Sequence, residues 1–143
     1  MENQNLEKAK SLLQTGGYTC VLCQGETCHT STSRGVRPLV QWLHSGMDLS
    51  GCSAADKVIG RATAFLYLLL GIRHVYGQVI SRPALAVFRS HGIAVSYGKL
   101  TDNIINRRGD GLCPFEEAVL TIEDPQTAHS AILEKMKELN IPL

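Results

Sequence analysis

The most apolar stretch of the chain runs from Val58 to Leu70, and it decides much of what this chain can fold into. Its 13 residues are well short of the roughly 20 that a membrane-spanning helix needs, so the stretch has to be buried inside the protein. We therefore predict a core helix that begins near Ser53 and runs to Leu70, where Gly71 ends it. The remaining elements have to cover this helix.

Segments with strand and helix patterns alternate along the rest of the chain. Short runs rich in Thr, Val, Tyr and Cys predict strands, whereas an apolar face at helical spacing or a capping residue predicts a helix. The predicted strands cover residues 18–24, 26–32, 74–80 and 93–97, and the predicted helices cover residues 2–14, 38–45, 53–70, 81–91, 101–108, 113–120 and 124–139.

The order of these elements indicates the fold class. The first two predicted strands flank Gln24-Gly25-Glu26 and form a hairpin. The later strands alternate with helices, which is typical of a layered α/β sheet. We predict a three-layer α-β-α fold with a mixed sheet and an additional N-terminal helix, in one domain over residues 1–143.

The composition excludes several classes of protein. The chain has 44% hydrophobic and 19% charged residues and a formal net charge of +1. A nucleic-acid binder usually carries a basic excess, and a chain that charge keeps disordered carries a large net charge, so neither class fits. Residues 1–10 are polar and lack the apolar stretch of a signal peptide. We therefore predict a cytoplasmic protein with no nucleic-acid or membrane partner.

An odd number of cysteines predicts reduced thiols and no disulfide framework. The five cysteines are Cys20, Cys23, Cys28, Cys52 and Cys113. The spacing of Cys20 and Cys23 also occurs in zinc sites, but residues three apart on a strand point to opposite faces of the sheet. We therefore predict small buried hydrophobic side chains here, with no metal site and no cofactor. The five histidines are scattered, without metal-ligand spacing, so no ligand role is predicted for them.

The first candidate site is the segment from Gly51 to Lys57, at the start of the predicted core helix. The free N–H groups of a helix start bind anions, and here Ser53 would add a hydroxyl and Lys57 a positive charge. The alternative is purely structural, because Ser53 followed by Asp56 at the third position matches a capping box.

The second candidate site is the loop of residues 31–38. Arg34 and Arg37 carry planar guanidinium groups that suit a phosphate or a carboxylate. Ser33 adds a hydroxyl, and Gly35 permits a close approach of the backbone. The loop lacks the glycine-lysine-hydroxyl pattern of a Walker loop, and an ordinary structural turn is the alternative interpretation.

The third candidate site lies around Cys113. A cysteine at the start of a helix has a lowered thiol pKa and forms a thiolate more readily. Glu116 follows three residues later and could bond back to the helix start or act as an acid or base. A structural turn followed by a capped helix explains the same residues without any chemistry.

Three segments of the chain resemble one known family. They run from Gly51 to Ala62, from Leu112 to Glu116 and from Ser33 to Leu39. Together they resemble an uncharacterised bacterial family, domain of unknown function 1893, and the resemblance covers nearly the whole chain. It implies a fold similar to that of cytidine deaminases, with a mixed sheet between helices and an added N-terminal helix.

The chain departs from the zinc deaminases in the residues that carry their chemistry. Those enzymes have His or Cys, any residue, then Glu at the start of the central helix, and Pro-Cys-x-x-Cys at the next helix. Residues 54–57 and 81–86 supply neither motif, so zinc-dependent deamination does not carry over. Lys57 and Arg82 would then stand in place of metal ligands, which favours an anionic small molecule.

These observations give a leading hypothesis and two alternatives. In the leading hypothesis the protein binds a small anionic ligand, such as a nucleotide, through Ser53, Lys57, Arg82 and the loop of residues 33–37. In the first alternative it is a metal-independent enzyme that uses Cys113 as nucleophile and Asp56 or Glu116 as acid or base. In the second it is a non-catalytic scaffold that forms a homo-oligomer.

Overall fold

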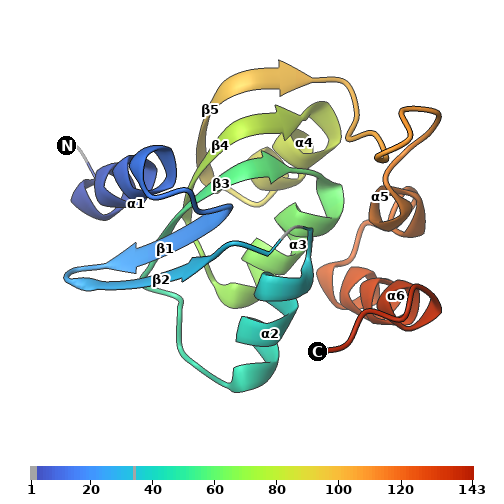
Figure 1. Cartoon of the computed structure of the whole chain (residues 1–143), viewed down its shortest axis with the longest axis horizontal. Coiled ribbons are helices and arrows are strands. Elements are labelled where there is room, and N and C mark those ends of the chain that lie inside the picture. The colour runs from blue at the N-terminus through green and yellow to red at the C-terminus, as the bar shows by residue number, and fades with distance from the viewer. Residues whose placement is uncertain (1–2, 34) are drawn as a thin grey trace.

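The framework of the protein is a five-stranded mixed sheet, in a computed structural model that describes residues 3–33 and 35–143 (Figure 1). The strands are β1 (Cys20–Gln24), β2 (Thr27–Ser31), β3 (Ser53–Ile59), β4 (His74–Ser81) and β5 (Ala94–Thr101). They lie in the order β2-β1-β3-β4-β5. β1 is antiparallel to both of its neighbours, whereas β3, β4 and β5 are parallel. The predicted α/β class and mixed sheet are therefore confirmed.

The helices cover both faces of this sheet. They are α1 (Gln4–Thr15), α2 (Arg37–Ser45), α3 (Arg61–Leu70), α4 (Arg82–Ser90), α5 (Pro114–Ala118) and α6 (Pro125–Glu138). Figure 1 shows α1 on one face of the sheet, and α3 and α4 on the other. α2, α5 and α6 pack against α3. None of the helices in the described part of the chain is long and apolar enough to cross a membrane.

The sheet separates two hydrophobic cores. In the smaller core, Ala9 and Leu13 of α1 pack against Val21, Cys23 and Ala55. The larger core lies on the other face and contains the neighbouring side chains of the same strands, together with α3 and α4. Strands that are buried on both faces need apolar residues at successive positions, and this is why β1 is apolar along its first four residues.

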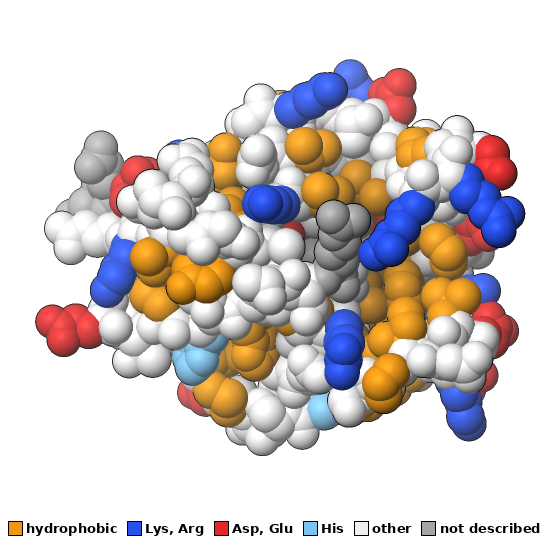
Figure 2. Space-filling view, viewed as in Figure 1, with side chains coloured by type: hydrophobic (Ala, Val, Ile, Leu, Met, Phe, Trp, Pro, Cys, Tyr) orange, Lys and Arg blue, Asp and Glu red, His pale blue; other side chains and the backbone are white. Residues whose placement is uncertain are grey.

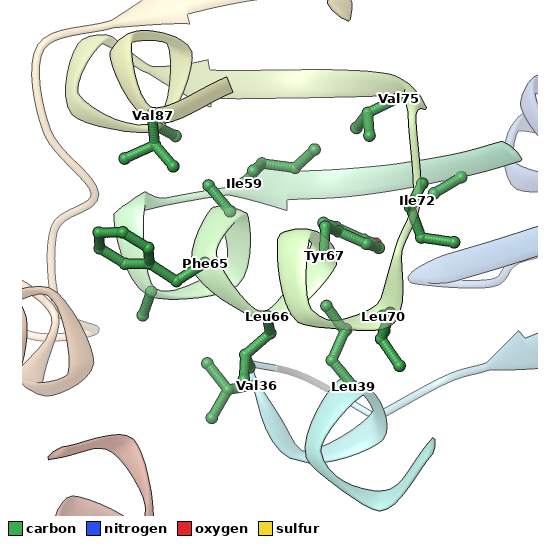
Figure 3. Close-up of a cluster of buried hydrophobic side chains, with 14 of the residues drawn as sticks. Val36, Leu39, Ile59, Phe65, Leu66, Tyr67, Leu70, Ile72, Val75 and Val87 are labelled. Atoms are coloured by element: carbon green, nitrogen blue, oxygen red, sulfur yellow. The ribbon is translucent and has the colours of Figure 1, made fainter. Parts of the chain in front are cut away.

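The larger core is built around α3. Every residue from Ala62 to Tyr67 is buried, as is Leu70. Figure 3 shows the α3 side chains pointing outward in several directions, toward Leu39 of α2 and toward Ile59 and Val75 of the sheet. A helix that is apolar all round has to be buried on all sides. The predicted burial of the apolar stretch is therefore confirmed for most of α3, whereas Val58 at its start is 47% exposed.

The predicted boundaries of the core helix are wrong. Residues 53–59 form strand β3, and α3 begins only at Arg61. β3 lies between β1 and β4 and pairs with both of them, so this segment gains strand hydrogen bonds on both sides. Gly60 has extended backbone (φ −100°, ψ −178°) and separates the strand from the helix. The spacing of Ser and Asp that matched a capping box therefore belongs to a strand.

The predicted helix over residues 101–108 is also wrong. β5 continues to Thr101, beyond its predicted end, and an irregular loop follows. The side-chain oxygen of Asn106 accepts hydrogen bonds from the backbone N–H groups of Gly109 and Asp110. An Asn that bonds to nearby backbone in this way stabilises a turn in place of a helix.

The prediction that all cysteines are reduced is contradicted at one pair. Cys23 and Cys28 form a disulfide, whereas Cys20, Cys52 and Cys113 are free thiols. The hairpin register places Cys23 directly opposite Cys28, with 4.2 Å between their Cα atoms. A count of cysteines over the whole chain could not show this local pairing. Cys20 does point to the other face of the sheet, as predicted, and packs in the larger core.

The C-terminal helix provides a test of the packing. Ala128, Ile132 and Met136 of α6 are buried, whereas Leu139 follows the end of the helix and is 44% exposed. We expect Ile132→Ala to lower the free energy of unfolding by about 2–4 kcal/mol, because it leaves a cavity. Leu139→Ala is the matched control, with an expected change within about 1 kcal/mol. Equal losses in chemical denaturation would contradict the packing of α6 on α3.

Candidate functional site

The carboxyl ends of the three parallel strands lie at one edge of the sheet. β3 leads into α3, β4 leads into α4, and β5 leads into the loop of residues 102–113. Because β1 is antiparallel to β3, its first residue pairs with Asp56, the middle residue of β3. Ligands of open α/β sheets bind outside the carboxyl ends of the strands, so we call this edge the candidate site.

Three buried polar side chains form a cluster at the middle of β3, on the face of the sheet that α3 covers. The Tyr67 hydroxyl donates a hydrogen bond to Oδ2 of Asp56 at 2.7 Å and lies 3.0 Å from Sγ of Cys20. We call Asp56, Tyr67 and Cys20 the Asp56 cluster. Its members come from β3, α3 and β1, and Figure 3 shows Tyr67 between the helix and the sheet. Asp56 is 8% exposed, whereas Cys20 and Tyr67 are 2% and 0% exposed.

Burial changes the acidity of all three groups. It raises the pKa of Asp56 to about 6, although the hydrogen bond from Tyr67 acts in the opposite direction. Burial and the nearby Asp56 carboxyl also raise the pKa values of Tyr67 and Cys20 well above their ordinary values. In the described part of the chain, no ion pair compensates the Asp56 carboxylate. Asp56 can therefore gain or lose a proton near neutral pH, as a general acid or base must.

The second buried acid at this edge, Glu116, caps α3. Its two carboxylate oxygens accept hydrogen bonds from the backbone N–H groups of Arg61 at 2.6 Å and Ala62 at 2.9 Å. Burial raises the pKa of Glu116, and these two N–H groups oppose the shift. The N–H groups of a helix start are an anion-binding site. In this protein its own carboxylate fills that site.

Gly60 lets Glu116 approach the start of α3. A Cβ atom at Gly60 would lie 2.5 Å from Oε1 of Glu116, which is closer than unbonded atoms can come. Arg61 binds the segment that follows α5. Its Nε donates a hydrogen bond to the carbonyl oxygen of Val119 at 3.2 Å, and its guanidinium forms an ion pair with Glu123 at 3.2 Å. The start of α3 is thus tied to α5 and to the chain that follows it.

Ser53 and Lys57 do not lie at a helix start, so the argument that placed an anion there is wrong. Both are on β3. Ser53 is buried, and its hydroxyl donates a hydrogen bond to Oδ1 of Asn3, which caps α1. Lys57 has an exposed side chain, and its backbone N–H donates to the carbonyl oxygen of Thr19. Lys57 leaves its charge exposed, on the face of the sheet opposite to the Asp56 carboxyl.

The loop before α2 reaches the same edge. The Thr19 hydroxyl donates to the carbonyl oxygen of Ser33 at 2.6 Å, which ties the loop to the start of β1. Gly35 has a positive φ of 75° in the turn before the helix. Arg37 is the first residue of α2, and its Nε is buried without a hydrogen-bond partner among residues 3–33 and 35–143. Arg34 lies outside the described residues.

Arg82 and Cys113 lie at the starts of other helices. Arg82 opens α4, is largely exposed, and its Nε pairs with Asp102 at 2.9 Å. Cys113 precedes α5 as predicted, but its side chain does not cap the helix. Within residues 3–33 and 35–143, no hydrogen bond or ion pair joins Cys113 to Asp56 or to Glu116. The structure therefore brings together Asp56, Tyr67 and Cys20, but not the three predicted catalytic residues.

The sequence contained one signal for Tyr67, the hydrogen-bond partner of Asp56 that the sequence analysis did not predict. Tyr67 is the hydroxyl-bearing aromatic residue of the apolar stretch, and a buried tyrosine hydroxyl usually finds a hydrogen-bond partner. Asp56, a polar residue next to the same stretch, was available for that role. The part played by Cys20 depends on the pairing of β1 with β3, which no local pattern shows.

Other surface features of the protein give weaker support for a binding site than this edge does. Figure 2 shows lysine and arginine side chains as separate groups on the face it presents, not as one continuous patch. An open depression of about 590 Å³ lies near the opposite edge, at the end of α3 and the start of β4, and none of the predicted site residues line it. No group of three or more His, Cys, Asp or Glu residues suited to a metal ion occurs in the described part of the chain.

Comparisons with known proteins place the chain among proteins of unknown function. The model of the family described as "Domain of unknown function (DUF1893)" matches residues 8–136. A solved structure of a DUF1893 family protein (TM1506) from Thermotoga maritima is similar over 94% of this chain and 92% of that chain, with a TM-score of 0.86 and 27% sequence identity. No curated protein matches the chain.

The contact between Gly60 and Glu116 gives a prediction about stability. We expect Gly60→Ala to lower the free energy of unfolding by about 1–3 kcal/mol, because the new methyl group forces the carboxylate away from the start of α3. Gly111→Ala is the control, since its Cβ would meet only Nδ2 of Asn106 at 3.7 Å. Denaturation of both variants measures the difference. If Gly111→Ala cost as much as Gly60→Ala, the close approach would not be the cause.

The raised pKa of Asp56 gives a prediction about pH. The folded protein keeps the proton up to about pH 6, whereas an unfolded Asp loses it near pH 4. Stability should therefore fall as pH rises from about 4 to about 6, by on the order of 3 kcal/mol from this group. Asp56→Asn, which carries no charge, should lack this loss, so its stability relative to the wild type should increase between pH 4 and pH 7.

Asp48→Asn is the control for this pH profile. Hydrogen bonds from Ser50 lower the pKa of Asp48, so the stability that this exposed group contributes is present at neutral pH and lost as pH falls. The control should keep the loss of stability between about pH 4 and pH 6 that Asp56 causes. Unfolding curves of Asp56→Asn and Asp48→Asn with the same pH dependence would contradict the assignment.

Proposed function

Because the chain belongs to the family described as Domain of unknown function (DUF1893), we propose its function from the chemistry of its own site. The protein binds a small anionic molecule, such as a nucleotide, at the carboxyl edge of the sheet. Asp56 is the group that exchanges a proton with that molecule. This role makes the protein a metal-independent acid–base catalyst or a pH-dependent binding protein.

The Asp56 cluster is the observation that carries this proposal. A carboxyl group that is buried without an ion pair destabilises the fold when it is charged, yet Asp56, which is 8% exposed, stands beside Tyr67 where an apolar residue would avoid that cost. A buried acid whose pKa is raised toward neutral pH is a candidate for a functional group. Tyr67 fixes one carboxylate oxygen, and the backbone N–H of Val58 donates to the other at 3.3 Å, so the carboxyl is held in one orientation.

The anionic character of the ligand follows from the charges around this edge. Lys57 follows Asp56 on β3 and is exposed, with its side chain on the opposite face of the sheet. Arg37 has a buried Nε without a partner in the described part of the chain, and a buried donor without a partner costs roughly 1–3 kcal/mol. A phosphate or carboxylate would accept from this donor. Two cationic side chains on different elements favour an anion over a neutral nucleobase.

The strand order also supports a fold similar to that of cytidine deaminases, which remains part of the proposal. In that arrangement the starts of α3 and α4 bound the site. They carry Gly60-Arg61-Ala62 and Ser81-Arg82-Pro83 here, which offer no thiolate or imidazole for zinc. The carboxylate at the start of α3 comes from Glu116 on α5 instead. These residue types favour chemistry that does not depend on zinc at this place.

The alternative with Cys113 as nucleophile receives less support. An attacking thiol needs a base within hydrogen-bond reach, and within residues 3–33 and 35–143 no hydrogen bond joins the Cys113 side chain to a base. The scaffold alternative does not explain why a proton-exchanging acid is kept in the core. Asp56 is therefore the residue on which the test depends.

The test measures binding of nucleoside phosphates, sugar phosphates and inorganic phosphate by calorimetry and by thermal unfolding. A ligand at 100 times its Kd should add about 2.7 kcal/mol to the stability of the wild type. Its affinity should change with pH around the pKa of Asp56, which is about 6. Phosphate groups also titrate near pH 6, so Asp56→Asn should show a different pH dependence from the wild type, and Arg37→Ala should weaken binding at every pH.

Asp48→Asn is the matched control, because it also removes one carboxyl, but from an exposed residue in the loop between α2 and β3 that is hydrogen-bonded to Ser50. It should bind like the wild type. If none of these compounds stabilises the protein, or if Asp48→Asn and Asp56→Asn bind alike with the same pH dependence, the proposed function is wrong.

A further inference from the structure

Two histidines from different helices face each other on the surface. The Nε2 atoms of His44 and His129 are 3.0 Å apart. Their imidazole rings meet edge to face, with centroids 5.2 Å apart and an angle of 77° between the planes. His44 lies in the last turn of α2, and His129 lies on the first half of α6. The two are 85 residues apart in the sequence, so only the fold brings them together.

The distance between the two nitrogen atoms suits a single metal ion. Bonds from zinc to imidazole nitrogen are about 2.0–2.1 Å long. Two such nitrogens on one tetrahedral ion are then about 3.3 Å apart, and two at right angles on a square-planar ion are about 2.9 Å apart. The observed 3.0 Å lies between these values. We propose that His44 and His129 form a two-imidazole site for a divalent nickel, copper or zinc ion, with water in its remaining positions.

The protonation state of the pair fits this role. Imidazole binds metals in its neutral form. Two Nε2 atoms 3.0 Å apart cannot both carry a proton, so at least one ring presents its Nε2 lone pair. Two neutral rings at this distance share one N–H···N hydrogen bond, in which one Nε2 carries a proton. When the metal binds, that ring moves its proton from Nε2 to Nδ1, so both Nε2 lone pairs point to the ion and no net charge is lost from the protein.

The ion would join α2 and α6, two helices that both lie against α3. α2 and α6 both pack against α3, and Figure 1 shows them on the side of α3 that faces away from the sheet. The pair lies away from the Asp56 cluster, and this inference does not depend on the proposed function. Because the two ligands are brought together only in the folded protein, bound metal should stabilise the fold.

The experiment titrates the full chain, without an affinity tag, with Ni²⁺ near neutral pH. Calorimetry gives the affinity and the stoichiometry, and thermal unfolding shows whether the ion binds the folded state. The variants are His44→Ala and His129→Ala. The control is His74→Ala, which removes an exposed histidine elsewhere in the chain, and Cys113→Ser tests a free thiol as the ligand.

We expect one Ni²⁺ per chain and a higher unfolding midpoint in the wild type, in His74→Ala and in Cys113→Ser. Either His44→Ala or His129→Ala leaves a single imidazole, so the affinity should fall more than about tenfold in each. The inference is overturned if both of these variants bind like the wild type, if Cys113→Ser removes the binding, or if Ni²⁺ binds without raising the midpoint. The pair would then be a hydrogen bond between two histidines.

Discussion

The carboxylate of Glu116 at the start of α3 is the contact on which much of this structure depends. α3 fills the middle of the larger core, so the direction in which it leaves the sheet determines where α2, α4, α5 and α6 can pack. Its first N–H groups are buried and need acceptors, and Glu116 supplies them from a helix far along the chain. The same contact requires a glycine at position 60 and places an acid at the edge where ligands of such sheets bind.

The sequence predicts the elements whose start and end signals are local. α1 ends at a glycine pair, α4 and α6 begin with a capping residue followed by proline, and the hairpin turns at Gly25. β3 is different, because a short apolar segment with Ser and Asp at helical capping distance is compatible with either a strand or a helix. Pairing with β1 on one side and β4 on the other makes this segment a strand. The residues that form this pairing lie in other segments of the sequence.

The candidate site was predictable in its residues more than in its geometry. Asp56 is part of a candidate segment in the sequence, but the argument there rested on a helix start that does not exist. Its partners Tyr67 and Cys20 come from two other elements, so the raised pKa of the carboxyl could not be derived before the fold was known. For Arg37 the sequence argument is compatible with the structure. Its side chain was predicted to bind an anion, and its Nε has no hydrogen-bond partner in the described part of the chain.

The disulfide between Cys23 and Cys28 has a consequence for the edge of the sheet. β2 is an outer strand, held by one neighbour, and its side chains are mostly only partly buried. A strand with so little buried surface can slide along its partner, and a slip of one residue would turn every side chain to the opposite face. A covalent bond between two directly opposed residues forbids such a slip. It keeps the outer strand in one alignment with β1.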